Sequence, residues 1–339
     1  MSIYEKNGYI DMAQIFKHQS TFSFITGARG TGKSYGSAKF LYENCDENNK
    51  FIWLRRTEVE SNILNSAFSN PFHKYFLDNS IDDKIEIEKI GKTGLIYIND
   101  KHVGFICALS TFANLRGADT LFSNVKYIFF DEFIASENKR KIKGEYDCFL
   151  NFYETVNRNR ELEGQSAIKC VCASNSNELA NPYYLGMECV EKVVNLQRLK
   201  QEKEYDVAKN VLFINIMKSP ISDKKRKTAI SKISTKAFDE MAFDNLFQLD
   251  TLNVKSLNLK DFKPLVKYGE LVIYIKKDNS CYYANTKKVG ECLTIPYGSI
   301  ESEAYFKTTF KNIYLSFIFN ENVFFENTTS KLLFKKAFE

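Results

Sequence analysis

The sequence is short of the residues that break regular structure, with only five Pro and fifteen Gly among its 339 residues. With 44% hydrophobic and 26% charged residues, this scarcity excludes a disordered or fibrous chain and predicts a globular one. No apolar run has the length of a signal-peptide core or of a membrane-spanning helix. We therefore expect a soluble, cytosolic protein with no membrane partner and room for two domains of ordinary size.

Paired metal-binding or cross-linking cysteines are also missing. The eight Cys residues include no CxxC pair, and no His residues stand at a matching spacing. Only Cys170 and Cys172 lie close together, and on a strand two residues apart they point to the same face. This pattern excludes zinc-finger and disulfide-stapled classes and predicts plain core packing for the pair.

Aromatic residues and one basic segment stand out among what is present. The 29 Phe and 19 Tyr residues predict a large aromatic core. Residues 218–236 hold seven Lys and Arg and a single Asp. Such a run is either a solvated surface or the electrostatic footprint of a protein that touches phosphate backbones, and the sequence leaves both interpretations open.

The first half of the chain alternates short β-branched or aromatic runs with helical stretches, which is typical of a parallel sheet covered by helices. A hairpin is expected around Asn99 and Asp100, between residues 94–98 and 102–109. The other expected strands are residues 22–26, 51–55, 125–130, 168–174 and 211–216. Expected helices are residues 33–45, 57–67, 145–160 and 183–201.

After Pro220 the pattern becomes basic and helix-prone, and from about residue 251 it changes again. There, runs alternating at period two are followed by helical segments. Strands are expected in residues 271–277, 280–287 and 291–297, and helices at 302–319 and 328–338. We therefore predict three parts: an α/β domain of residues 1–217, a small helical linker of residues 218–250, and an α+β domain of residues 251–339.

One motif carries a strong chemical prediction. The segment from Gly27 to Ser34 matches GxxxxGK[ST] and lies between an expected strand and an expected helix, a context that argues against a chance glycine turn. Its backbone amides would cradle phosphates, Lys33 would place a charge on the β and γ oxygens, and Ser34 would ligate Mg²⁺. The predicted ATP-binding residues are Gly27, Ala28, Arg29, Gly30, Thr31, Gly32, Lys33, Ser34 and Tyr35.

A second motif separates nucleotide hydrolysis from nucleotide binding. Residues 125–132 form a hydrophobic strand that ends in Asp131 and Glu132. At a strand end, Asp131 is placed to hold Mg²⁺ through water, and Glu132 to orient and deprotonate the attacking water. The alternative is a solvated pair of acids, which the preceding apolar residues argue against. An adjacent Asp-Glu pair is the mark of one branch of P-loop ATPases, the ASCE type.

Further candidates are polar residues near the ends of the neighbouring elements. Asn175 follows the strand of residues 168–174 and is the candidate γ-phosphate sensor, with an ordinary Asn turn as the alternative. Arg158 and Arg160 fall at the end of an expected helix, on different faces, and Arg116 falls in an expected loop. Each of these arginines is a catalytic candidate, although exposed arginines are most often solvated.

Four blocks of this sequence resemble, in order and spacing, the genome-packaging ATPases of phi29-like bacteriophages. They are FITGARGTGKSY, IFFDEFI, TVNRNRE, and CVCASN followed by NPYY, all between about residues 20 and 250. The resemblance implies a P-loop ASCE-type motor that drives double-stranded DNA into a procapsid as a ring, usually of five subunits. It also implies ATP and Mg²⁺ as cofactors, a portal partner at the capsid vertex in the host cytoplasm, and in some members a scaffold RNA.

The resemblance also implies roles for single residues. Arg158 falls on the family's trans-acting arginine finger, and Arg116 on a second basic residue credited with signalling between subunits. Arg160 is then expected to be a structural partner of a nearby acid. Lys33 and Ser34 keep the phosphate and Mg²⁺ roles, with Asp131 as the Walker B acid and Glu132 as the catalytic base.

The family's C-terminal domain resembles a degenerate RNase H-type nuclease. An active site of that type needs carboxylates that converge on two metal ions. Between residues 265 and 300 the acids are Glu270, Asp278 and Glu291, all expected at strand ends or turns. We therefore expect a module that contacts DNA or the portal without cutting DNA.

Other functions remain possible from the sequence. They are a terminase with an active nuclease, an ATPase of DNA repair or recombination, and a nucleotide-gated binding module that hardly turns over. Glu132 argues against the last of these, because a pure switch needs no base.

Overall fold

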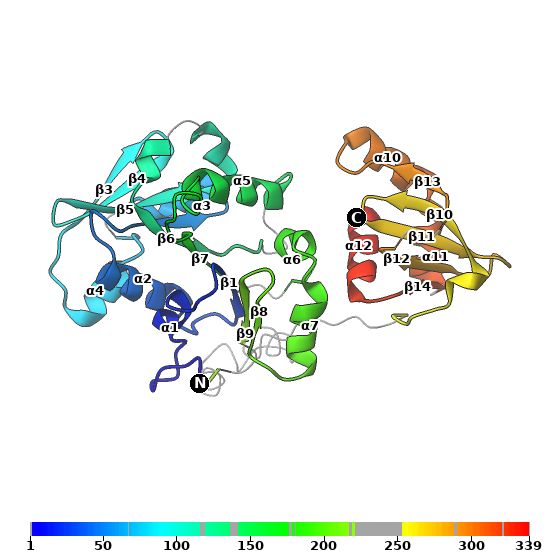
Figure 1. Cartoon of the computed structure of the whole chain (residues 1–339), viewed down its shortest axis with the longest axis horizontal. Helices are drawn as coiled ribbons and strands as arrows, with labels where there is room; N and C mark the ends of the chain where they lie inside the picture. Colours follow the sequence, from blue (N-terminus) through cyan, green and yellow to red (C-terminus); the bar gives the residue numbers. More distant parts are fainter. Residues whose placement is uncertain are drawn as a thin grey trace. The chain divides into compact units, whose positions relative to one another are not determined.

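The computed structural model describes residues 2–66, 68–115, 119–135, 142–175, 178–179, 181–216, 219–220, 253–287, 290–320 and 322–338. The chain divides into two compact units, one of Met1–Glu178 with Leu196–Phe247 and one of Leu179–Asn195 with Gln248–Glu339. Each unit has its own sheet (Figure 1). The basic run 218–236 lies outside the described residues apart from Ser219 and Pro220. The predicted division into three parts at 217/218 and 250/251 therefore stays a prediction.

Nine strands of the described chain form the sheet of the first unit, in the order β3-β4-β5-β2-β6-β7-β1-β9-β8. The six strands from β5 to β9 in this order run parallel, and antiparallel pairs are confined to its two edges. The strands are β1 (Phe22–Gly27), β2 (Lys50–Arg55), β3 (Ile85–Ile90), β4 (Thr93–Ile98), β5 (Lys101–Ala108), β6 (Val125–Asp131), β7 (Lys169–Ser174), β8 (Lys203–Asp206) and β9 (Val211–Ile216). The predicted α/β class with a mainly parallel sheet is confirmed.

The central strands form where the sequence has continuous apolar runs, as parallel strands buried on both faces require. Every residue of β9 is buried, and so are most of those in β1, β2 and β7. The expected hairpin is present as β4 and β5, joined by Asn99 and Asp100 at φ 49° and 64°. Two central residues with positive φ suit the tight turn of a two-residue hairpin, and Asn and Asp tolerate that conformation.

Helices cover both faces of the first sheet (Figure 1). Apolar residues of α1, α2 and α4 pack with the strands in one core cluster, while rings of α5 pack on the opposite side. On that side Phe149 of α5 contacts Phe24 of β1 and Phe130 of β6. The helices of the first unit are α1 (Met12–Phe16), α2 (Lys33–Asn44), α3 (Glu58–Leu64), α4 (His73–Asn79) and α5 (Glu145–Asn157), with 3₁₀ turns η1 (Leu109–Leu115) and η2 (Asp119–Phe122). Helix α6 (Pro182–Gly186) and the first part of α7 (Val190–Arg198) belong to the second unit.

The second unit carries a separate five-stranded sheet, in the order β13-β10-β11-β12-β14. Its first three strands in sequence form an antiparallel meander, and β13 and β14 add parallel edges. The strands are β10 (Phe262–Tyr268), β11 (Leu271–Lys276), β12 (Tyr282–Asn285), β13 (Leu293–Ile295) and β14 (Val323–Phe325), after the 3₁₀ turn η4 (Leu259–Asp261). The helices are α10 (Ile300–Thr309), α11 (Lys311–Phe319) and α12 (Thr328–Phe338). A second, C-terminal sheet with helices was predicted and is confirmed.

The three acids considered for a nuclease lie in turns or next to a strand end, as predicted. Glu270 stands between β10 and β11, Asp278 between β11 and β12, and Glu291 just before β13. The Asp278 carboxylate accepts hydrogen bonds from Ser280 and pairs with Lys276, and these contacts lower its pKa to about 2. This carboxylate is occupied by its own turn rather than directed into the sheet.

Two expected helices are each broken in two. The expected helix 183–201 ends at Gly186 and resumes at Val190, with Glu188 between them at φ 54°. A left-handed residue ends a helix because it turns the chain away from the helical path. The expected helix 302–319 breaks at Phe310, which ends α10 and precedes α11.

The predicted packing of the cysteine pair is confirmed. Cys170 and Cys172 are buried on β7 with their sulfur atoms 3.8 Å apart. Burial raises the pKa of the Cys172 thiol, so the group stays protonated.

None of the helices in the described ranges has both the length and the apolar character needed to span a bilayer.

Candidate active site

The P-loop connects the carboxyl end of β1 to the amino end of α2. Gly30 and Gly32 have φ of 68° and 94°, a left-handed conformation that glycine adopts at no steric cost. Gly27 is packed so tightly against β9 that an added Cβ would stand 2.8 Å from the Cβ of Ile216. Because α2 starts at Lys33 after this turn, the loop amides gather at a helix N-terminus, where anions bind.

Lys33 lies inside this loop. Its ammonium donates hydrogen bonds to the carbonyl oxygens of Gly27 at 2.8 Å and Ala28 at 3.0 Å, and to the hydroxyl of Thr31 at 3.2 Å. The side chain is 6% exposed. Arg29 is exposed beside it. The loop therefore holds a fixed positive charge at the position predicted for phosphate contact.

Tyr35, the last of the residues predicted to bind the nucleotide, faces α4. Its ring makes an edge contact with Tyr75 at 5.5 Å between centroids, and its hydroxyl accepts a hydrogen bond from Asn79. The N-terminal segment is a second neighbour of the loop, and it was not predicted. There Ile10 donates its backbone N–H to the carbonyl of Thr31 at 2.9 Å.

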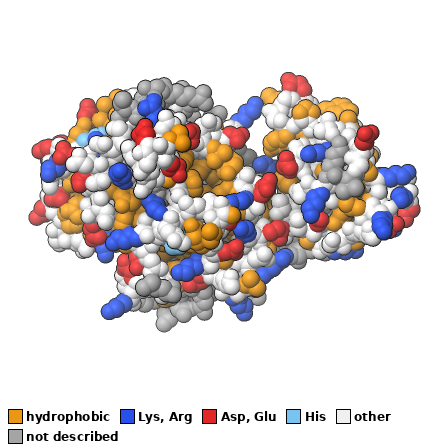
Figure 2. All heavy atoms as spheres, viewed as in Figure 1, with side chains coloured by type: hydrophobic (Ala, Val, Ile, Leu, Met, Phe, Trp, Pro, Cys, Tyr) orange, Lys and Arg blue, Asp and Glu red, His pale blue; other side chains and the backbone are white. Residues whose placement is uncertain are grey.

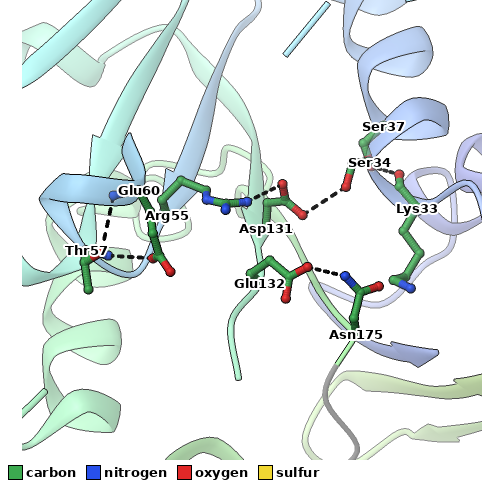
Figure 3. A network of polar contacts seen from close by, with 9 residues as sticks. All are labelled: Lys33, Ser34, Ser37, Arg55, Thr57, Glu60, Asp131, Glu132 and Asn175. Carbon is green, nitrogen blue, oxygen red and sulfur yellow. Dashed lines mark hydrogen bonds and ion pairs between the residues drawn. The ribbon is translucent and has the colours of Figure 1, made fainter. Parts of the chain in front are cut away.

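The acid pair lies beside the P-loop, as Figure 3 shows. Asp131 is the last residue of β6, and its Oδ1 accepts a hydrogen bond from the Ser34 hydroxyl at 3.0 Å. Ser34 and Asp131 thus bring together a hydroxyl and a carboxylate oxygen, ligands that Mg²⁺ prefers. In the described ranges no group of three or more His, Cys, Asp or Glu side chains is arranged for a metal. Two such ligands fit a Mg²⁺ ion that takes its remaining ligands from phosphates and water.

Glu132 begins the turn that leaves the sheet after β6. It has φ 59°, and its backbone N–H donates to the carbonyl of Ala173 on β7 at 2.7 Å. Phe133 and Ile134, which follow it, are buried. A non-glycine residue at positive φ is strained by about 1 kcal/mol or more, and such strain tends to persist at functional sites. The buried neighbours hold the Glu132 carboxylate toward the site.

Asn175 meets Glu132 across the sheet edge. Its side-chain amide donates a hydrogen bond to Glu132 Oε1 (Figure 3). The strand order explains this contact, since β7 lies between β6 and β1, and Asp131 is in register with Ala173. The structure thus brings together Lys33, Ser34, Asp131, Glu132 and Asn175, which come from three neighbouring parallel strands and the loops that follow them.

Two basic residues at the end of β2 were not predicted. Arg55 places its Nη1 2.6 Å from Oδ2 of Asp131, opposite the oxygen that Ser34 contacts. Arg56 is fully buried and pairs with Glu145, the first residue of α5, through two hydrogen bonds of 2.6 and 2.8 Å. A strand ending in two arginines was the only sequence signal, and it became informative once β2 was known to lie next to β6.

The arginines after α5 lie elsewhere. The helix expected to reach residue 160 ends at Asn157, so neither Arg158 nor Arg160 is on it, and Arg158 caps it at φ 50° with its side chain exposed. Arg160 is buried and donates a hydrogen bond to the main-chain carbonyl of Ser123. Arg116 lies outside the described residues.

The end of α5 and Arg160 lie at the amino ends of β6 and β7, because Ser123 stands two residues before β6, and Asn157 accepts a hydrogen bond from the backbone N–H of Ile168, just before β7. Seven strand residues separate this end from Asp131, or about 20 Å.

Comparison with known proteins identifies the family. The sequence profile of the podovirus DNA encapsidation protein (Gp16) family matches residues 4–295. The chain belongs to this family. The DNA packaging protein of Bacillus phage phi29 is 28% identical over 262 residues, which cover 76% of this chain and 72% of the relative. The DNA packaging protein of Bacillus phage B103 is 27% identical over 280 residues, covering 80% and 79%.

Solved structures agree with the Gp16 fold. The chain resembles one in "The bacteriophage Phi-29 viral genome packaging motor assembly" with a TM-score of 0.62 at 21% identity, covering 99% of each. It resembles one in "The Phi-28 gp11 DNA packaging Motor" with a TM-score of 0.63 at 19% identity, covering 98% of this chain and 99% of the other. At these identities the likeness shows the fold alone, and it extends over both units of the chain.

Proposed function

We propose that this Gp16-family chain hydrolyses ATP with Mg²⁺ and uses the energy to translocate double-stranded DNA into a viral procapsid. The observation that carries the proposal is the meeting of the acid pair with the P-loop. Ser34 and Asp131 contact each other at 3.0 Å, while the adjacent Glu132 is held by Asn175. Membership of a DNA encapsidation family supplies the substrate and the procapsid.

Each residue of the site has a distinct task in hydrolysis. The P-loop amides and Lys33 would bind the phosphates, and Ser34 and Asp131 would hold Mg²⁺, which supplies positive charge to the β and γ oxygens. Glu132 accepts the proton of the attacking water, which needs a carboxylate fixed within hydrogen-bond reach. Asn175 holds that carboxylate and is the candidate sensor of the γ-phosphate, because it links Glu132 to β7.

The proposal is tested with purified chain, procapsids and double-stranded DNA. We expect ATP, but not ADP, to make the DNA resistant to added nuclease, and we expect procapsids and DNA together to stimulate ATP hydrolysis. Hydrolysis stimulated by DNA alone, with no protected DNA, would favour an ATPase of repair or recombination. Cutting of the DNA without added nuclease would favour a terminase with an active nuclease.

We further propose that the chain works as a homo-oligomeric ring, in which Arg158 enters the nucleotide site of a neighbour. Arg158 caps α5 beside the amino ends of β6 and β7, whereas Asp131 lies at the carboxyl end of β6, a strand length of about 20 Å away. Head-to-tail contacts that close on themselves generate rings and bring opposite edges of adjacent copies together. An arginine supplied in this way can raise turnover by roughly 10³ to 10⁵. Arg116 is the second candidate for this inter-subunit role. The proposal also includes a ring of five subunits and a portal partner, and a scaffold RNA as in some members of the family.

Mixing of two inactive variants tests the trans role. Arg158→Ala leaves its own site intact, and Glu132→Gln leaves its arginine intact, so mixed rings should regain part of the ATPase activity that each variant lacks alone. The measurement is ATP hydrolysis on procapsids as the ratio of the two variants is changed. Exposed Arg198, replaced by Ala, is the matched control and should behave like wild type. Normal hydrolysis by Arg158→Ala alone would remove the assignment and leave Arg116 as the next candidate.

The basic run 218–236 is the proposed non-specific DNA contact. On the face drawn in Figure 2, the described Lys and Arg side chains are interspersed with Asp and Glu rather than gathered in one basic patch. The run holds a denser positive charge than that face, with seven Lys and Arg and one Asp in the sequence. Such a segment would bind phosphates without reading bases.

Charge reversal tests this contact. Replacing Lys224, Lys225 and Lys227 by Glu should weaken binding to any double-stranded DNA and flatten the dependence of log affinity on log salt by about 3. Binding is measured by fluorescence anisotropy across a salt series with two unrelated DNA sequences. An unchanged affinity and slope would assign the run to a solvated surface.

A further inference from the structure

Arg55 occupies one of the two oxygens of the proposed magnesium acid. Its Nη1 is 2.6 Å from Asp131 Oδ2, and the Ser34 hydroxyl is 3.0 Å from Oδ1 (Figure 3). The side chains of Arg55 and Asp131 are 17% and 12% exposed. Both oxygens that a metal ion could approach are therefore engaged, one of them by a cation in poorly hydrated surroundings.

The sheet itself sets this placement. Strands β2 and β6 pair in parallel, with Leu54 in register with Phe130, so the next residues, Arg55 and Asp131, end their strands side by side. The Nε of Arg55 is also buried and makes no hydrogen bond within the described part of the chain. A buried guanidinium donor without a partner is unfavourable.

We propose that Arg55 is a competing cation that keeps free Mg²⁺ off Asp131, so that the metal enters the site only together with ATP. The proposal rests on the ATP site proposed above. Two cations drawn to opposite oxygens of one carboxylate repel each other, and even with strong screening this repulsion changes metal affinity by a factor of about ten or more. The phosphates of ATP offset the repulsion, because they attract both the metal and the guanidinium.

The opposite role would be orientation, with Arg55 holding Asp131 in the rotamer that Mg²⁺ needs. Ser34 already fixes Oδ1 of that carboxylate through its own hydrogen bond, so little orientation is left for Arg55 to supply. The repulsion therefore outweighs the gain in orientation. The two roles differ in sign, since loss of a competitor strengthens metal binding and loss of an orienting group weakens it.

The test is Mn²⁺ binding to the full chain without nucleotide, followed by electron paramagnetic resonance. Arg55→Gln and Arg55→Met should each bind Mn²⁺ about tenfold or more tightly than wild type, while Arg55→Lys, which keeps the charge, should stay near wild type. Lys92→Gln is the matched control, because it removes one positive charge from an exposed pair with Glu58 and should change nothing. Adding Asp131→Asn to Arg55→Gln should abolish the gain.

Unchanged or weaker Mn²⁺ binding by both uncharged variants would overturn the proposal, and so would a gain that survives Asp131→Asn. A second arm with ATP separates this outcome from failure of the ATP site. If wild type binds Mn²⁺ with ATP but the variants show no gain without it, only the role of Arg55 is wrong. If wild type takes up no Mn²⁺ even with ATP, the proposed site itself fails, and the role of Arg55 fails with it.

Discussion

Lys33→Ala is expected to reduce ATP hydrolysis at least about 10²- to 10³-fold and to abolish DNA packaging. Lys33 is the charge that the P-loop encloses, held by the carbonyls of Gly27 and Ala28 at 2.8 and 3.0 Å. The γ-phosphoryl group gathers negative charge during transfer, and alanine leaves that charge without its fixed partner on the β and γ oxygens. The measurement is steady-state release of phosphate in the presence of procapsids and DNA.

Lys74→Ala is the matched control for this prediction. Its side chain is 74% exposed and pairs with Asp78 within one turn of α4, an exposed pair that contributes little to stability. The control should hydrolyse ATP like wild type. Turnover at the wild-type rate by Lys33→Ala would remove the P-loop from the mechanism and with it the whole account of the site.

Glu132→Gln is expected to bind ATP normally and to hydrolyse it about 10²- to 10⁴-fold more slowly. The amide keeps the shape of the side chain, and its oxygen can still accept the hydrogen bond that Asn175 donates. It cannot take a proton from water at neutral pH, so only the chemical step is lost. Binding is measured with a fluorescent ATP analogue, and hydrolysis in a single turnover.

Glu163→Gln provides the control, since Glu163 is an exposed acid in the turn after α5 and should be neutral for both measurements. Loss of ATP binding in Glu132→Gln would mean that Glu132 supports the fold of the loop. In that case another group would have to act as the base.

The strands that carry the site were predictable because their signal is local. Strands β1, β2, β6, β7 and β9 are mostly apolar runs, as burial on both faces demands, and the first four end in glycine or a polar residue. Their carboxyl ends meet at one edge of a parallel sheet, so the P-loop and the acid pair could be expected to lie close together.

Elements at the edges of the fold were missed for physical reasons. In β3 only Ile85 and Ile87 are partly buried, and the residues between and after them are exposed, as at a sheet edge. The alternation of apolar and charged residues in β3 is short, so the local sequence is a weak signal for a strand. Pairing with β4 therefore decides its conformation. The breaks at Glu188 and Phe310 interrupt sequences with good helical periodicity and depend on packing around the turns.

The contact between Arg55 and Asp131 could not be predicted from the sequence. These residues are 76 positions apart, and their pairing depends on the insertion of β6 next to β2 rather than next to β1. Strand order is a property of the whole sheet, and no local pattern near Arg55 reports it. The position of Arg158 could not be predicted either, because it depends on where α5 ends, beside the amino ends of the strands.

The central claim is that one constellation, the P-loop with Asp131, Glu132 and Asn175, binds Mg²⁺ and ATP for hydrolysis. An experimentally determined structure of Glu132→Gln with ATP and Mg²⁺ tests it most directly, because this variant should hold the uncleaved nucleotide. We expect the triphosphate on the P-loop amides and Lys33, with Mg²⁺ on Ser34 and facing Asp131. A nucleotide bound away from the P-loop, or a metal held by other residues, would contradict it.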